Sequence, residues 1–171
     1  MAAPSITVPP VGSNFRSGFY AGLFLTVVLG IYLARLWQPD RQVQLHSAHL
    51  ISQIEKRNWS AVADFLGADY RDQWGDDRRL VLERLREVFG APGSVNITAN
   101  NEVIRSEGGD GWWKAKITIK AGGPLGADIE ERINSLSTPF ELEWHRLSSS
   151  PWDWKLINVT NPALEIPRRI D

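Results

Sequence analysis

The residues best suited to acid–base chemistry lie in one short segment, residues 68–77, which reads "ADYRDQWGDD". Asp69 and Asp72 supply carboxylates, and Tyr70 lies between them with a hydroxyl group. A carboxylate can accept a proton from a substrate, and a phenol can donate a hydrogen bond to the charge that then develops. Tyr70 and Trp74 are four residues apart, so they could either wall a pocket for a small apolar ligand or close one end of a hydrophobic core.

Other kinds of site chemistry have little support in the sequence. The chain has no cysteine, which excludes disulfides, thiolate catalysis and cysteine-ligated zinc or iron–sulfur sites. His46 and His49 are three residues apart on a predicted helix, but no third ligand accompanies them. His145 alternates with glutamates and is therefore expected on a polar strand face. We predict no metal site and no cofactor.

The composition indicates one globular domain and argues against nucleic-acid binding. The chain of 171 residues is 43% hydrophobic and 23% charged, which is ordinary for a globular protein. Its formal net charge is −1, whereas broad nucleic-acid binding needs a surplus of lysine and arginine. Eight tryptophans are unusual in a chain of this length, and they predict a tryptophan-rich core.

An apolar segment near the N-terminus predicts a single membrane span. No charged residue lies between Arg16 and Arg35, and a bilayer core needs about 20 helical residues, with a lower limit near 17. We place the transmembrane helix at residues 16–37, after an N-terminal tail at residues 1–15. The alternative is a cleaved signal peptide, but the segment lacks a basic start, and Tyr32 is too large for the −3 position of a cleavage site after Ala34.

Small residues recur at every fourth position of this segment. Residues four apart share one face of a helix, and small side chains there let two helices approach closely in lipid. The stripe predicts a helix–helix contact with a second copy or with another membrane-associated protein, although glycine and alanine are common in spans for other reasons. The contact candidates are Gly18, Gly22, Thr26, Gly30 and Ala34. Basic residues are nearly balanced on the two sides, and the length of the C-terminal part favours an exoplasmic or periplasmic domain.

Helical patterns follow a short linker at residues 38–41. Apolar positions from residue 41 to residue 57 fit an amphipathic helix, with Asp40 as a candidate cap. Ser60 is the candidate cap of a short second helix that ends at Gly67. A third helix is expected to begin after Asp76 or Asp77 and to run to residue 89.

Strand patterns replace helical ones after Gly93. The clearest strand, around residues 113–120, alternates apolar residues with lysines, and a later one at 139–147 alternates apolar residues with glutamates. Lys114 and Lys116 are therefore expected to face Glu141 and Glu143 across an antiparallel pair. The remaining expectations are a strand at 95–105 bulged at residues 100–101, a glycine-rich turn at 108–111, one helical turn at 129–133 and a last strand at 152–161.

These elements predict an α+β fold in which three helices cover the apolar face of a curved antiparallel sheet. In the strand that follows the glycine-rich turn, Trp112 and Trp113 must face opposite ways, so one of them is expected on the outer face. A tryptophan exposed there would mark a contact with a protein or a membrane.

Two stretches resemble the nuclear transport factor 2-like (NTF2-like) family. "KRNWSAVADFLGADYRDQWGDDRRLVLERLREVF" is similar to that family's helix pair followed by a third helix, and "WKLINVTNP" is similar to its closing strand. The resemblance covers roughly residues 42–165, which we take as the domain, with a C-terminal tail at 166–171. It implies a cone that encloses a pocket, in a family that includes steroid isomerases, dehydratases, ligand binders and protein-binding domains. No residue here aligns with a catalytic motif of the family.

We predict a single-pass membrane protein whose NTF2-like domain binds a protein partner or a second copy of itself at the bilayer, without catalysis. The alternative is a small-molecule pocket, including an isomerase- or dehydratase-like enzyme. An open pocket of several hundred Å³ with the acidic segment inside would favour the alternative, and a closed, tryptophan-filled cone would exclude an enzyme. The pocket candidates are Asp69, Tyr70, Asp72, Trp74, Trp113 and Trp144.

Overall fold

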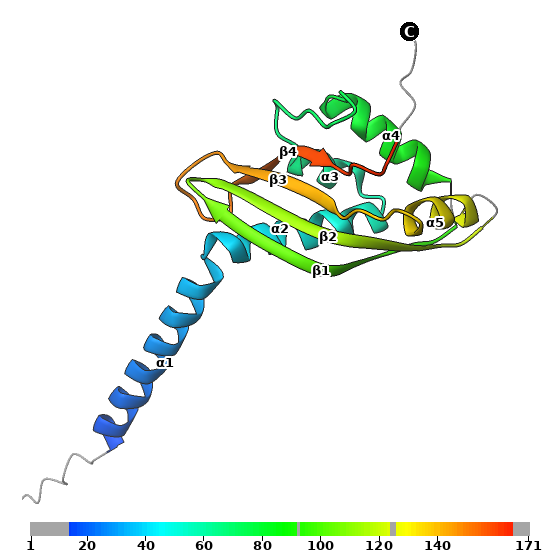
Figure 1. The fold of residues 1–171 in the computed structure, drawn as a ribbon. Helices are drawn as coiled ribbons and strands as arrows, with labels where there is room; N and C mark the ends of the chain where they lie inside the picture. The colour runs from blue at the N-terminus through cyan, green and yellow to red at the C-terminus, as the bar shows by residue number, and fades with distance from the viewer. Residues whose placement is uncertain (1–13, 92, 124–125, 166–171) are drawn as a thin grey trace, which may run out of the picture. The chain divides into compact units, whose positions relative to one another are not determined.

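The computed structural model describes residues 14–91, 93–123 and 126–165, which form two compact units divided between Leu36 and Trp37. The first unit is the helix α1 (Asn14–Leu36), and the second holds the remaining helices and a sheet (Figure 1). The predicted C-terminal tail lies outside the described residues, as does all but the last part of the predicted N-terminal tail.

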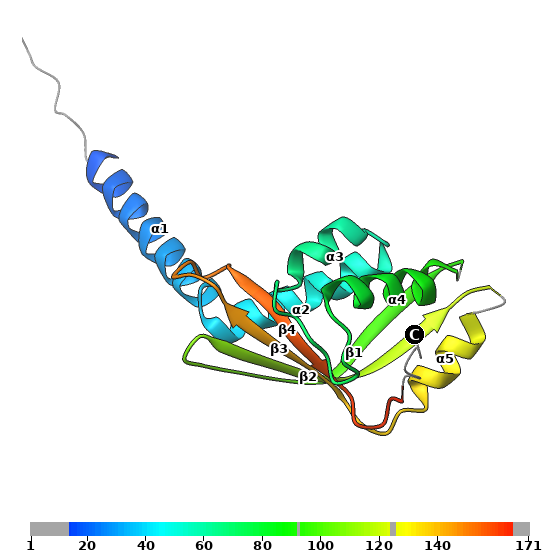
Figure 2. The same ribbon diagram turned by 90° about the horizontal axis from the view of Figure 1, so that it is seen from above.

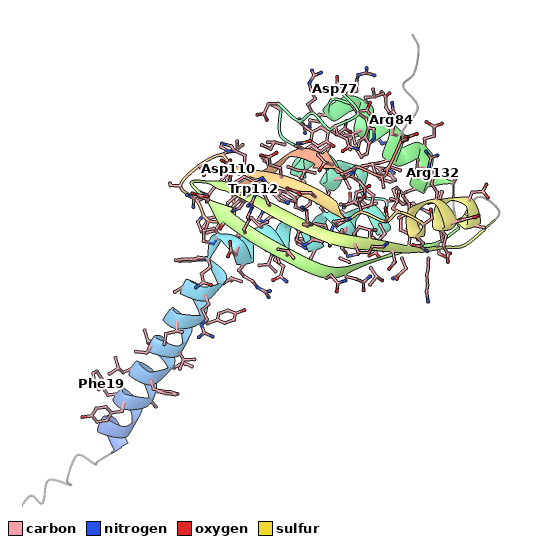
Figure 3. The ribbon with its side chains drawn as sticks, in the orientation of Figure 1. Phe19, Asp77, Arg84, Asp110, Trp112 and Arg132 are labelled. Atoms are coloured by element: carbon pink, nitrogen blue, oxygen red, sulfur yellow. The ribbon has the colours of Figure 1, made fainter. Side chains whose placement is uncertain are left out.

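Helix α1 is long and apolar enough, from Gly18 to Leu36, to cross a membrane. Its large apolar side chains from Phe19 to Tyr32 are exposed (Figure 3). The hydroxyl group of Thr26 donates a hydrogen bond to the carbonyl oxygen of Gly22 at 2.9 Å, so this polar group is satisfied within the helix. The apolar helix is thus confirmed, and an uncleaved membrane span stays a prediction.

The next two helices begin at residues other than the predicted caps. Helix α2 (Pro39–Glu55) starts with proline in its first turn, and the predicted cap Asp40 instead accepts a hydrogen bond from Ser106 at 2.5 Å. Helix α3 (Trp59–Phe65) is capped by Asn58, whose side chain accepts from the N–H of Ala61 at 3.4 Å. The Ser60 cap was wrong because the chain enters the helix two residues earlier than predicted.

Helix α4 (Arg78–Gly90) begins as predicted. The side chain of Asp77 accepts a hydrogen bond from the N–H of Leu80 at 2.8 Å. Helix α5 (Gly126–Asn134) is longer than the single turn predicted. Its last residue, Asn134, bonds both the N–H and the carbonyl group of Ile119, at 2.8 and 3.0 Å, and these bonds hold the helix against the sheet.

The sheet has four antiparallel strands in the order β1 (Val95–Glu107), β2 (Asp110–Ala121), β3 (Phe140–Arg146) and β4 (Trp154–Thr160). The predicted bulge in β1 is confirmed as a register shift between Asn100 and Val103. Gly108 and Gly109 make the turn between β1 and β2, both with positive φ. Gly111 is not part of that turn as predicted, because it lies within β2 and is buried.

Helices α2, α3 and α4 gather on one side of the sheet, while α5 lies where β2 leads into β3 (Figure 2). The inward residues of the strands form the core together with these helices, and the core contains Trp113, Trp144 and Trp154, each at most 2% exposed. The predicted α+β fold with a tryptophan-rich core is therefore confirmed.

The opposite face of the sheet is polar, as the alternation predicts. Lys114 and Glu141 are register partners and form an ion pair at 2.6 Å. The second predicted charge pair is wrong: the ammonium group of Lys116 donates to the carbonyl oxygen of Leu136, and Glu143 accepts from Asn158 instead. Register explains the difference, because Glu143 lies opposite Trp112 rather than opposite a lysine.

Candidate functional site

A cavity of about 510 Å³ lies between the helices and the inner face of the sheet. Most of the side chains that line it are apolar and come from every helix of the second unit and all four strands. Three of the lining residues, Glu87, Val88 and Arg132, are exposed, so the cavity opens to solvent between α4 and α5. Its size and apolar lining are those of a small-molecule site.

One wall of the cavity is polar and is built by the loop between α3 and α4. Asp72 organises this loop, because its Oδ1 atom accepts hydrogen bonds from the N–H groups of Trp74 and Asp76, at 3.0 and 2.9 Å. Gly75 provides the left-handed backbone that the turn requires, with a φ of 88°. The loop thereby holds an acidic side chain, only 7% exposed, against the cavity.

Tyr70 and Asp72 are both buried at this wall and lie close enough for their charges to interact. Burial, together with the charges of Asp72 and Asp76, raises the pKa of the Tyr70 hydroxyl group far above its ordinary value of 10.0. Burial also raises the pKa of Asp72 above its ordinary value of 3.8, against the lowering effect of its backbone hydrogen bonds. The wall therefore combines a phenol that stays protonated with a carboxyl group that binds its proton more tightly than an exposed one does.

Asp76 and Arg84 form an ion pair beside the same wall. The distance between Asp76 Oδ2 and Arg84 Nε is 2.6 Å. Arg84 belongs to α4 (Figure 3). Asp76 Oδ2 accepts no other hydrogen bond from the described residues, so Arg84 compensates the burial of this oxygen. Asp76 is buried and Arg84 is partly exposed, and both line the cavity.

The last described residues close one side of the cavity. Leu164 lines it, and the carbonyl oxygen of this residue accepts a hydrogen bond from Trp74 Nε1 at 2.9 Å. The guanidinium group of Arg132 donates to the carbonyl oxygen of Glu165 at 2.6 Å. Buried Asn161 holds this C-terminal segment in place through hydrogen bonds with Gln73 and with Thr138, which precedes β3.

Four of the six pocket candidates line the cavity and two do not. Tyr70, Asp72, Trp74 and Trp113 form part of its wall. Asp69 is exposed and lies outside the lining. Trp144 is fully buried in the core instead, where its indole N–H donates to Ser47 at 3.0 Å.

Sequence reasoning missed two charged residues of the polar wall, Asp76 and Arg84. Asp76 was considered only as a helix cap, and Arg84 was not considered at all. A signal was present, because Arg84 falls on the same helical face as Val81, Leu85 and Val88, which line the cavity. A charged residue within an apolar stripe indicates a buried partner or a site.

His46 and His145 contact backbone or side-chain oxygens of neighbouring elements. The two ring nitrogens of His46 lie 2.8 and 3.0 Å from the carbonyl oxygens of Gln42 and Trp152. His145 lies on the polar sheet face and its Nδ1 is 2.6 Å from an oxygen of Asp110. Within the described residues, no three histidine or acidic side chains gather closely enough to hold a metal ion.

The small residues of α1 form a second candidate site. An added Cβ atom at Gly18, Gly22 or Gly30 would meet nothing within 4 Å, and Thr26 and Ala34 are exposed on the same helix. This face leaves room for close approach of another helix.

Comparisons with known proteins identify the fold. No family model matches the sequence, and no curated protein matches it. A solved structure of a candidate dehydratase of the NTF2-like family from Streptomyces avermitilis matches with a TM-score of 0.53 at 15% identity, over 70% of this chain and 91% of the other. An NTF2-like protein of unknown function from Pseudomonas putida matches with a TM-score of 0.52 at 10% identity, over 70% and 82%.

A third match is a protein of unknown function with a cystatin-like fold from Nostoc punctiforme, with a TM-score of 0.52 at 11% identity, over 72% of this chain and 91% of the other. Identities this low establish the fold alone. The chain therefore has the NTF2-like fold, as the sequence resemblance predicts.

Proposed function

We propose that the NTF2-like domain of this protein binds a small, largely apolar molecule and that α1 holds the domain at a membrane. The cavity of about 510 Å³ carries this proposal, because its lining is mostly apolar and one wall brings together a few polar groups. Such a combination lets burial of apolar area supply affinity while the polar wall fixes the ligand's orientation.

The size of the cavity favours a ligand site over a packed core. Buried side chains in a tight core fill the space between layers, leaving few voids larger than a water molecule. Here Tyr70, Trp74 and Trp113 surround the space rather than fill it. An acid–base reaction at Tyr70 and Asp72 would require the same cavity, so ligand binding is the first property to test.

The test measures binding of 1-adamantanol, a compact apolar alcohol, to the full chain in nanodiscs of phosphatidylcholine by titration calorimetry, with empty nanodiscs as the blank. Ile117→Trp places a large ring in the cavity, and Thr118→Trp places the same ring on the outer face of the same strand. We expect saturable one-to-one binding that Ile117→Trp weakens by about tenfold or more, because the ring occupies the site, and that Thr118→Trp leaves unchanged.

Val159→Phe, which fills the cavity from β4, serves as a second blocking variant if Ile117→Trp lowers the melting temperature strongly. If the wild-type chain binds no more alcohol than empty nanodiscs do, or if both tryptophan variants bind equally well, the cavity is not a ligand site.

Binding of a protein partner or of a second copy is a second candidate function. Two observations favour it. The first is the open face of α1. The second is half-buried Trp112 on the outer sheet face (Figure 3), whose ring centroid lies 4.7 Å from the Arg105 guanidinium group. Crosslinking from native membranes, with α1 intact, tests it. Recovery of the chain without any crosslinked partner or second copy would rule it out.

A further inference from the structure

The polar wall of the cavity carries an excess of negative charge. The charged residues of this wall are the acids Asp72 and Asp76 and, from α4, the base Arg84, so two negative charges meet one positive charge. Glu87 and Arg132, one acid and one base, are exposed at the opening and add no net charge. Asp76 and Arg84 form an ion pair at 2.6 Å. Within the described residues no ion pair joins Asp72 to a cation, so the two buried acids Asp72 and Asp76 share the charge of one arginine, Arg84.

The Asp72 carboxylate also has hydrogen-bonding capacity to spare. Its Oδ1 atom accepts hydrogen bonds from two backbone N–H groups, those of Trp74 and Asp76. A carboxylate has about four acceptor positions, so two donors on Oδ1 leave acceptor positions on Oδ2 for a ligand. Asp72 lines the cavity, and these positions are therefore within reach of a molecule bound there.

Aromatic rings complete the environment of a cationic group. Tyr70, Trp74 and Trp113 all line the cavity, and the face of such a ring attracts a cation. An anionic head group would instead meet two buried carboxylates that share a single arginine, and like-charge repulsion and desolvation disfavour it there. A neutral donor could use a free acceptor position, but a charged donor forms a hydrogen bond roughly twice as strong.

We propose that the ligand of this cavity is an apolar molecule with a protonated amine, whose ammonium group binds the Asp72 carboxylate while its hydrocarbon body lies among the apolar side chains. This inference rests on the proposed function and names the chemical class of its ligand. It goes beyond apolar burial because it assigns the head-group preference to one side chain.

The test compares three probes of one shape: 1-adamantanamine, 1-adamantanol and 1-adamantanecarboxylate. Each is titrated calorimetrically at pH 7 into the full chain in uncharged phosphatidylcholine nanodiscs, against empty nanodiscs. We expect the amine to bind about tenfold more tightly than the alcohol, which corresponds to one charge-assisted hydrogen bond, and the carboxylate to bind more weakly than both.

Asp72→Asn removes the charge but keeps an oxygen to accept the two backbone hydrogen bonds, and Asp69→Asn makes the same change at an exposed acid outside the cavity. The amine preference should fall to about threefold or less in Asp72→Asn, with the alcohol affinity retained, and persist in Asp69→Asn. Circular dichroism and melting temperature show whether each variant is folded.

A pH titration of the wild-type chain gives a readout without any variant. The groups that face Asp72 are Tyr70 and Asp76 from its own loop and Arg84 from α4. Protonation of Asp72 removes the negative charge, so amine affinity should fall as the solution is acidified while alcohol affinity stays constant. The inference is overturned, and the proposed function stands, if the alcohol binds as tightly as the amine at pH 7. If no probe binds, the proposed function itself fails.

Discussion

Gly111→Ala should destabilise the domain by about 1–3 kcal/mol, because β2 passes too close to α2 for a side chain at this position. A Cβ atom built on Gly111 would lie 2.3 Å from Val43 Cγ2 and 3.1 Å from Trp154 Cζ3. Carbon atoms pack best at about 3.5–4.0 Å, so the methyl group is more than 1 Å too close to Val43. Val43 is fully buried and cannot move aside without disturbing the core.

Urea unfolding of the full chain in nanodiscs, followed by tryptophan fluorescence, measures the effect. With a denaturant slope of about 2 kcal/mol per molar, a loss of 2 kcal/mol lowers the unfolding midpoint by about 1 M. Gly90→Ala is the matched control, because a Cβ atom there meets nothing within 4 Å and its stability should stay the same or rise slightly.

Val43→Ala tests the cause, since it removes the clashing methyl group. Alone it should cost about 2 kcal/mol for the lost burial. In that background Gly111→Ala should cost less than about 1 kcal/mol, so the two effects should not add. Strict additivity, or a neutral Gly111→Ala, would refute the reasoning.

Three further predictions concern charge and the first helix. The folded-state pKa of Asp72 is raised above 3.8, so the folded state binds this proton more tightly than the unfolded state, and the free energy of unfolding falls as pH rises above 3.8. Asp72→Asn should lack this decline and gain stability relative to wild type between pH 4 and pH 7, as measured by urea unfolding. Parallel curves of stability against pH for the two chains would contradict this prediction. Glu141→Gln should cost less than about 1 kcal/mol, because its ion pair with Lys114 is partly exposed, and the cost should shrink in 1 M salt. If the small residues of α1 form a helix–helix contact, Gly22→Ile should weaken self-association in membranes, measured by energy transfer between labelled copies. Unchanged energy transfer would show that these small residues do not form such a contact.

Periodicity was enough to predict the sheet. In β2 the inward residues Trp113, Ala115 and Ile119 are buried, as their alternation with lysines requires. The bulge was visible as an Asn100–Asn101 pair, and Asn101 does adopt a positive φ of 56°, which asparagine tolerates. The helix cap at Asp77 was also predictable, because a short acidic side chain before an apolar stripe satisfies the first free N–H groups.

The site was harder to predict because it depends on contacts between segments far apart in sequence. The loop was found from its residue types, yet nothing local told exposed Asp69 from buried Asp72. Their difference comes from backbone hydrogen bonds to Asp72 that exist only once the loop has closed. Trp144 was misplaced for a related reason: inward strand positions were treated as pocket positions, whereas α2 and α3 pack directly on that part of the strand.

The edge strand β1 bears on how copies of this protein could meet. It is 13 residues long, and an edge of that length is a template for strand-to-strand aggregation. Two features oppose this: the bulge interrupts the ladder, and the carboxylate of Glu55 accepts the N–H of Ile97 at 2.7 Å, where a foreign strand would otherwise bind. The guarded edge therefore directs any pairing of copies away from dimers built on a continuous sheet.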